Sequence, residues 1–209
     1  MGLRKAGDHA VALRPIEQRE YPRDTDGLLA QLSDADPSVR RWAARDLADH
    51  PRAAAGVCAR VAVEADPGVR AALFNTAAAL GGPVVAEAMV QLLRSEEPAV
   101  RNGAIEVLAG APDEAAPHID RLLRDADTDV RIFTVNLLGE LRHPDVPCWL
   151  AQVLESEADT NVIGAALEVL LEVGGPETLP VLERARHRFA GEPYIGFSID
   201  LAVERIGTA

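Results

Sequence analysis

The side chains that most often carry metal or nucleophilic chemistry are few and scattered in this sequence. The histidines are His9, His50, His118, His143 and His187, and the cysteines are Cys58 and Cys148. A metal site or an activated cysteine needs two or more such groups held close together. No two of them lie within one helical turn of each other. We therefore expect no metal, no cofactor and no catalytic residue, and we interpret the thiols as small buried apolar side chains.

One short segment combines cations with an aromatic ring: Arg41, Trp42 and Arg45, followed by Asp46. Guanidinium groups and indole rings bind phosphates and bases in many nucleic-acid proteins. The chain as a whole carries 21 basic and 33 acidic side chains, a net charge of −12. Because binding to phosphate backbones needs clustered cations, we expect no nucleic-acid partner.

An internal repeat predicts the helices that carry these residues. Six segments align, and their Val or Ile positions are 30, 31, 30, 32 and 33 residues apart. In chain order the segments span residues 36–40, 66–70, 97–101, 127–131, 159–163 and 192–196. Four of them begin with Asp or Glu followed by Pro, which is typical of a helix cap and a first helical residue.

Two helices are predicted in each repeat, here named helix A and helix B. The capped segment opens helix B, where apolar residues recur at helical spacing, as in Val100, Ala104 and Leu108. Helix A precedes it with its own apolar stripe, such as Ile119, Leu122 and Leu123. The predicted helix pairs span about 25–49, 51–80, 83–110, 112–141, 144–174 and 176–207.

The predicted fold is therefore all-α, a right-handed α-solenoid of about six helix pairs. We predict a repeat domain over residues 24–209 and an N-terminal arm over residues 1–23. The segment 1–20 lacks an apolar core of the kind a signal peptide needs, and no long apolar run is present. The expected location is cytoplasmic, without contact to a membrane.

The Asp-Pro-x-Val-Arg pattern resembles the short HEAT-like repeat of the phycocyanobilin-lyase type over about residues 25–207. The resemblance implies a ladder in which the carboxylate at the turn pairs with the helix B arginine of a neighbouring repeat. The carboxylates would be Asp36, Asp66, Glu97 and Asp127, and the arginines Arg40, Arg70, Arg101 and Arg131. The pattern departs from the family at Ile163 and Gly196, where no arginine stands.

The resemblance also implies that the B helices line a concave surface. Side chains two and six positions after the Val or Ile should then point into it. The expected partner-binding residues are Arg41, Arg45, Asn75, Asn102, Glu106, Ile132, Asn136, Glu168, Phe197 and Leu201. A small rotation of the helices would instead bury Phe197. For Trp42 and Phe133 we favour a place in the core.

The predicted function is a non-enzymatic protein-interaction module or assembly scaffold. Residues 61–209 hold 11 basic and 24 acidic side chains, so the partner is expected to have basic patches. Residues 1–60 hold ten basic and nine acidic side chains, so the first repeat could receive an anionic segment instead. A homodimer through the C-terminal repeat is also open, because Phe197, Ile199, Val203 and Ile206 lie on its last helix.

The resemblance leaves one enzymatic alternative, a bilin lyase or a cofactor-handling chaperone subunit. Arg41 and Arg45 would then receive a propionate of the tetrapyrrole, while apolar side chains of the groove pack on its rings.

Overall fold

The computed structural model describes residues 22–208, so most of the predicted arm, residues 1–21, lies outside the described residues. The described chain is all-α and has no strand. The helices are α1 (Thr25–Gln31), α2 (Pro37–Asp46), α3 (Ala54–Val61), α4 (Pro67–Leu80), α5 (Gly82–Leu92), α6 (Pro98–Ala109), α7 (Pro112–Leu122), α8 (Thr128–Glu140), α9 (Val146–Ser156), α10 (Thr160–Val173), α11 (Leu179–Arg188) and α12 (Pro193–Thr208). Short 3₁₀ turns cover Leu47–Asp49, Pro51–Ala53 and Pro176–Thr178.

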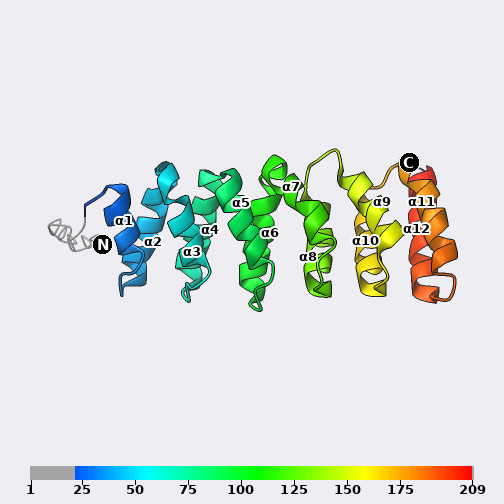
Figure 1. The fold of residues 1–209 in the computed structure, drawn as a ribbon, viewed down its shortest axis with the longest axis horizontal. Coiled ribbons are helices and arrows are strands. Elements are labelled where there is room, and N and C mark those ends of the chain that lie inside the picture. The colour runs from blue at the N-terminus through cyan, green and yellow to red at the C-terminus, as the bar shows by residue number, and fades with distance from the viewer. Residues whose placement is uncertain (1–21, 209) are drawn as a thin grey trace, which may run out of the picture.

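These helices form the six predicted pairs, which follow one another in a row from the N-terminus to the C-terminus (Figure 1). The odd-numbered helices are the A helices and the even-numbered ones are the B helices. Each B helix packs against its own A helix and against the B helices before and after it. The predicted solenoid is confirmed, because no helix buries its apolar stripe alone and every interior pair is covered by its neighbours.

The apolar positions that define helix B form the core. Val69, Val100, Val130, Val162 and Ile195 are all buried, as are Leu108, Leu138 and Leu170 two turns later. Thr134 replaces an apolar residue at this stripe, and its hydroxyl donates to the Val130 carbonyl at 2.7 Å. This bond satisfies a polar group that burial would otherwise penalise.

The predicted caps explain where the B helices begin. The carboxylates of Asp36, Asp66, Asp127 and Asp159 each accept a hydrogen bond from a backbone N–H in the first turn, at 2.8–2.9 Å. Glu97 makes no such bond to its helix. Gly81 and Gly82 join α4 to α5 with φ of 58° and 80°, a region that side chains disfavour, so glycine is needed there.

The turn between the A and B helices is closed by a residue that the sequence pattern did not single out. We name it the pre-cap residue, because it stands two positions before the cap. The pre-cap residues are Asp34, Glu64, Ser95, Asp125 and Glu157. Each accepts a hydrogen bond from the backbone N–H of the cap residue through its side chain, at 2.8–3.3 Å. Where the cap is an aspartate, the turn thus has two side-chain acceptors. The cap carboxylate binds N–H groups of helix B, and the pre-cap side chain binds the N–H of the cap residue.

The helix B arginines hold this same turn from the other side. Arg40, Arg70, Arg101 and Arg131 each donate to the backbone carbonyl of their own pre-cap residue, at 2.7–3.1 Å. Three of them also reach the next repeat. Arg40 binds Glu64 through two hydrogen bonds of 2.8 and 2.9 Å, Arg131 binds Glu157, and Arg70 binds Glu97.

The ladder therefore exists, but most of its predicted carboxylates are wrong. Asp36, Asp66 and Asp127 cap their helices, and the inter-repeat partner is the pre-cap glutamate in two of the three joints. Only Glu97 pairs as predicted, where the pre-cap residue is Ser95 and offers no charge. Arg101 makes no ion pair in the described residues, and its guanidinium lies 4.6 Å from the centre of the Phe133 ring.

The absence of an arginine at Ile163 is compensated from the following repeat. Ile163 is apolar and fully buried, so it offers no donor to the carbonyls of the turn. Arg188 of α11 instead donates to the Glu157 carbonyl, the atom that a helix B arginine would have bound, and also to the Leu154 carbonyl at 2.8 Å. The turn is thus closed in this repeat as well.

Glu64 is the most buried member of the ladder, and its removal should be costly. Its carboxylate has no exposed area and accepts hydrogen bonds from Arg40, Arg60 and the Asp66 N–H. The Arg40 hydrogen bond is the main reason that the pKa of Glu64 falls from 4.5 to about 2. A shift of this size corresponds to about 3 kcal/mol of folding free energy at neutral pH.

We predict that Glu64→Gln lowers the free energy of unfolding by about 3 kcal/mol near neutral pH, measured by urea unfolding monitored by circular dichroism. Because the folded pKa is lower than the unfolded one, the contribution is present above the unfolded pKa of 4.5 and is lost as the pH falls toward 2. The difference between the two proteins should therefore shrink to less than half by about pH 3.

Glu87→Gln is the matched control, because Glu87 contacts Arg121 on the exposed surface of the A helices. It should leave the unfolding midpoint nearly unchanged. A Glu64→Gln protein as stable as the wild type, or a difference independent of pH, would contradict the role given to this carboxylate.

Candidate functional site

The exposed surface of the B helices is a feature that all six repeats share. We name it the B face and define it by the positions two and six after the Val or Ile of each helix B. All six residues at the sixth position are exposed: Arg45, Asn75, Glu106, Asn136, Glu168 and Leu201. At the second position Ala71, Asn102 and Phe197 are exposed, Arg41 and Ile132 are half-buried, and Gly164 is buried.

The structure brings six of the ten predicted residues together in two clefts between neighbouring B helices. The first cleft lies between α4 and α6 and is lined by Asn75, Asn102 and Glu106. The second lies between α8, α10 and α12 and is lined by Ile132, Asn136 and Glu168, with Glu192 and Tyr194 at its C-terminal side. The predicted residues contribute amides and carboxylates, which can hold the backbone and the cations of a bound segment, and Arg70 also lines the first cleft.

The other four predicted residues lie at the two ends of the row. Arg41 and Arg45 belong to α2, whereas Phe197 and Leu201 belong to α12. Five steps of about 10 Å between packed helices separate these ends. They are too far apart for one small molecule to contact Arg41 or Arg45 together with Phe197 or Leu201.

Both ends expose aromatic side chains. Tyr194 and Phe197 are 62% and 66% exposed and form a stripe with Leu201 on α12. The core interpretation fails for Trp42, which is 59% exposed, and the Arg45 guanidinium lies 5.3 Å from the centre of its ring. Phe133, by contrast, is half-buried against the core beneath Arg101.

Trp42 and Phe133 stand at the same position, three residues after the Val of their helix. Their exposure differs because of what lies next to that position in each repeat. In α6 this position is Gly103, where an added Cβ would lie 2.4 Å from the Phe74 ring of the preceding B helix. In α8 it is Phe133, against Arg101 of the preceding B helix. The position therefore faces backward along the row. In the described residues no B helix precedes α2, so Trp42 stays uncovered.

The apolar residues that suggested a C-terminal dimer face are mostly core. Ile199 and Ile206 are buried, and Val203 packs partly against the core. Only Phe197 of that group is exposed, and it lies on the B face. The last helix is thus packed on the fifth repeat in the ordinary way.

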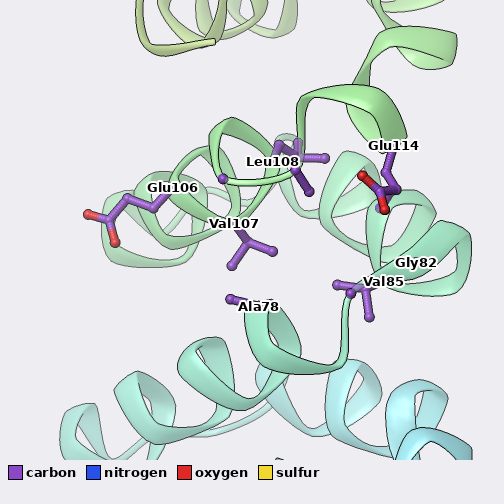
Figure 2. Close-up of a pocket in the computed structure, with 11 residues that line it drawn as sticks. Ala78, Gly82, Val85, Glu106, Val107, Leu108 and Glu114 are labelled. Carbon is purple, nitrogen blue, oxygen red and sulfur yellow. The ribbon is translucent and has the colours of Figure 1, made fainter. Parts of the chain in front are cut away.

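A smaller apolar pocket lies at the joint between the second and third repeats. Figure 2 shows Val107 pointing toward Ala78 across it, with Val85 and Gly82 beside them. The Glu106 side chain points away from this group, toward the B face (Figure 2). Among the residues that line it, the ionisable ones are the two carboxylates Glu106 and Glu114, whose side chains lie on opposite sides of Val107 (Figure 2).

Three further expectations concern metal ligands, the burial of the two cysteines and helices that could span a membrane. Within residues 22–208, no three His, Cys, Asp or Glu side chains are grouped so that they could hold a metal ion. Cys58 is buried as expected, but Cys148 is exposed, so the prediction for Cys148 was wrong. No helix in the described part of the chain has the length and apolar character needed to cross a membrane.

Six consecutive helix pairs of similar length and packing define a repeat protein, and the comparisons give its family. The family model described as HEAT repeats matches residues 25–109 and 115–189, so the chain belongs to the HEAT repeat family. A search among curated proteins found no match.

Solved structures are similar to the chain in fold. The karyopherin Kap121p bound to the extreme C-terminus of the protein phosphatase Cdc14p is 15% identical, with 87% of this chain and 23% of that chain covered and a TM-score of 0.47. An engineered protein is 16% identical, with 89% and 99% covered and a TM-score of 0.45. The complex of CpcE and CpcF of phycocyanin lyase from Nostoc sp. PCC7120 is 16% identical, with 94% and 99% covered and a TM-score of 0.36.

We predict that Phe197→Asp combined with Leu201→Asp leaves the fold intact. Both side chains are exposed, so new charges there meet water, and the free energy of unfolding should change by less than about 1 kcal/mol. Ile199→Asp on the same helix should cost about 4 kcal/mol or more, because Ile199 has no exposed area. Thermal unfolding followed at 222 nm distinguishes the two, and equal losses would contradict this assignment of the faces of α12.

Proposed function

We propose that this HEAT repeat protein is a non-enzymatic interaction module that binds a protein partner along the B face. The observation that carries the proposal is the distribution of exposed apolar side chains. Five of the seven large apolar side chains exposed in the described residues lie on B helices: Trp42, Val173, Tyr194, Phe197 and Leu201. Three of them, Tyr194, Phe197 and Leu201, form one stripe on α12, and exposed apolar groups gathered in this way are typical of protein contacts.

The clefts between these ends support a partner with basic groups. Glu106 stands in the first cleft, and Glu168 and Glu192 in the second. Within the described residues no ion pair is formed by these three carboxylates, whereas the ladder carboxylates are all engaged. Lysine or arginine side chains of a partner would therefore find acceptors whose charge the fold itself does not use.

The repeat domain over residues 24–209 is the proposed binding unit, and the ten predicted residues are its proposed contacts. A homodimer would have to use Phe197 and Leu201, since Ile199 and Ile206 are buried. No observation on the B face favours the tetrapyrrole function over this one.

Affinity capture from the native cell tests the proposal. Full-length wild-type bait should recover a partner that bait carrying Phe197→Asp and Leu201→Asp loses by about tenfold or more, measured by quantitative mass spectrometry. The matched control is Val84→Asp, because Val84 is 53% exposed but lies on α5, an A helix. The control bait should recover the partner as the wild type does.

Equal loss with Val84→Asp would contradict the B face as the binding surface, and recovery that is unaffected by the α12 variant would do the same. A partner that is recovered together with a visible chromophore would favour the tetrapyrrole alternative, because protein alone has no absorbance at those wavelengths.

Ionic strength tests the electrostatic part of the proposal separately. If carboxylates of the B face steer a basic partner, the association rate should fall clearly between about 0.05 and 0.5 M salt, while the dissociation rate changes less. Stopped-flow or surface-based kinetics with the captured partner measure both rates. An association rate independent of salt would contradict the assignment of basic patches to the partner.

A further inference from the structure

Arg41, Trp42 and Arg45 form a cluster on α2 whose charge opposes that of the rest of the B face. The two arginines are four residues apart, so they lie on one side of the helix, and the Arg45 guanidinium stacks on the Trp42 indole. Beyond α2, the predicted contact residues that carry a charge are the glutamates Glu106 and Glu168. The first repeat is thus the cationic end of an acidic surface.

Among the described residues, neither of these two guanidinium groups is used in an ion pair of the fold. The ladder arginine of this repeat is Arg40, which binds Glu64 and the carbonyls of Asp34 and Ala35. Nearby carboxylates are also engaged: Asp46 pairs with Arg23, and Asp66 caps α4. Within residues 22–208 neither Arg41 nor Arg45 forms an ion pair, and the buried Nε of Arg41 has no hydrogen-bond acceptor.

Arg41 extends from the cluster toward the next B helix, α4. Its Nη1 lies 3.8 Å from the point where Gly68 would carry a Cβ, at the start of α4. Arg41 therefore lies close to the start of α4, one of the two helices of the α4–α6 cleft, while Arg45 lies over the exposed indole. A segment that enters the B face at this end meets two cations and an aromatic ring before it meets the carboxylates.

We propose that Arg41, Trp42 and Arg45 are a docking site for an acidic segment of the protein partner, with carboxylates on the two arginines and an apolar side chain on the Trp42 ring. The proposal rests on the proposed function, in which the partner lies along the B face. A partner segment with acidic groups at one end and basic groups at the other would then bind in one direction only, because reversal brings like charges together.

The molecule supplies its own reporter for this site. Trp42 is exposed, whereas the other tryptophan, Trp149, is buried and stacks on His143 at 5.0 Å. In full-length protein with Trp149→Phe, the tryptophan emission therefore comes from Trp42 alone. The probe is a short synthetic peptide of glutamates around one central leucine, and its counterpart has lysine in place of every glutamate.

We expect the glutamate peptide to shift the Trp42 emission to shorter wavelength with saturation, since the bound leucine removes water from the indole. The lysine peptide should not do so. Arg41→Gln with Arg45→Gln should weaken the glutamate peptide by about tenfold or more, measured also by the anisotropy of a dye-labelled peptide. Arg52→Gln with Arg142→Gln removes the same charge from exposed positions away from α2 and should leave the affinity within about twofold.

Four results would overturn the proposal: no saturable binding of the glutamate peptide, equal binding of the lysine peptide, an equal loss in the control variant, or tighter binding of an oligothymidylate to the same three residues. An emission shift that grows with protein concentration alone would assign the site to a second copy of the chain. These titrations need no native partner, so their failure is separate from a failure of the capture experiment, which depends on α12.

Discussion

The hydrogen bond from the helix B arginine to the carbonyl of its pre-cap residue is the interaction on which the rest of the fold depends. It occurs in four repeats, through Arg40, Arg70, Arg101 and Arg131. It fixes the angle between helix A and helix B, because the cap residue and the pre-cap carbonyl are held from opposite sides. In the fifth repeat, where Ile163 replaces the arginine, the same carbonyl is bound by Arg188 from the following helix A. The hydrogen bond at the turn is thus kept, although its donor comes from another helix.

This arginine–carbonyl hydrogen bond also determines which carboxylates are available at the joints between repeats. A pre-cap glutamate is long enough to bind both its own cap N–H and the arginine of the preceding repeat, as Glu64 and Glu157 do. Burial alone would raise the pKa of Glu157, but its hydrogen bonds from Arg131 and two backbone N–H groups outweigh this and lower the pKa. Charged joints of this kind hold neighbouring repeats in register without a larger apolar core.

The helices and their caps could be predicted from the sequence because they depend on local chemistry. Asp66, for example, binds N–H groups two and three residues away. The partner of each arginine could not be read from the repeat pattern, since it lies in the next repeat, although the recurring acids Asp34, Glu64, Asp125 and Glu157 were a visible signal. The exposure of Trp42 was missed for another reason, because the same position is covered in inner repeats and only the place of α2 in the row uncovers it.

The structure separates two classes of arginine that composition alone cannot tell apart. Those at the first turn of helix B, with Arg188 and Arg205, bind backbone carbonyls or carboxylates within the chain. Arg41 and Arg45 stand one and five positions further along α2, on the exposed face. A net charge of −12 therefore understates the contrast along the B face, since the cations that remain available there are concentrated in the first repeat. A partner that matches this surface must itself change sign along its length.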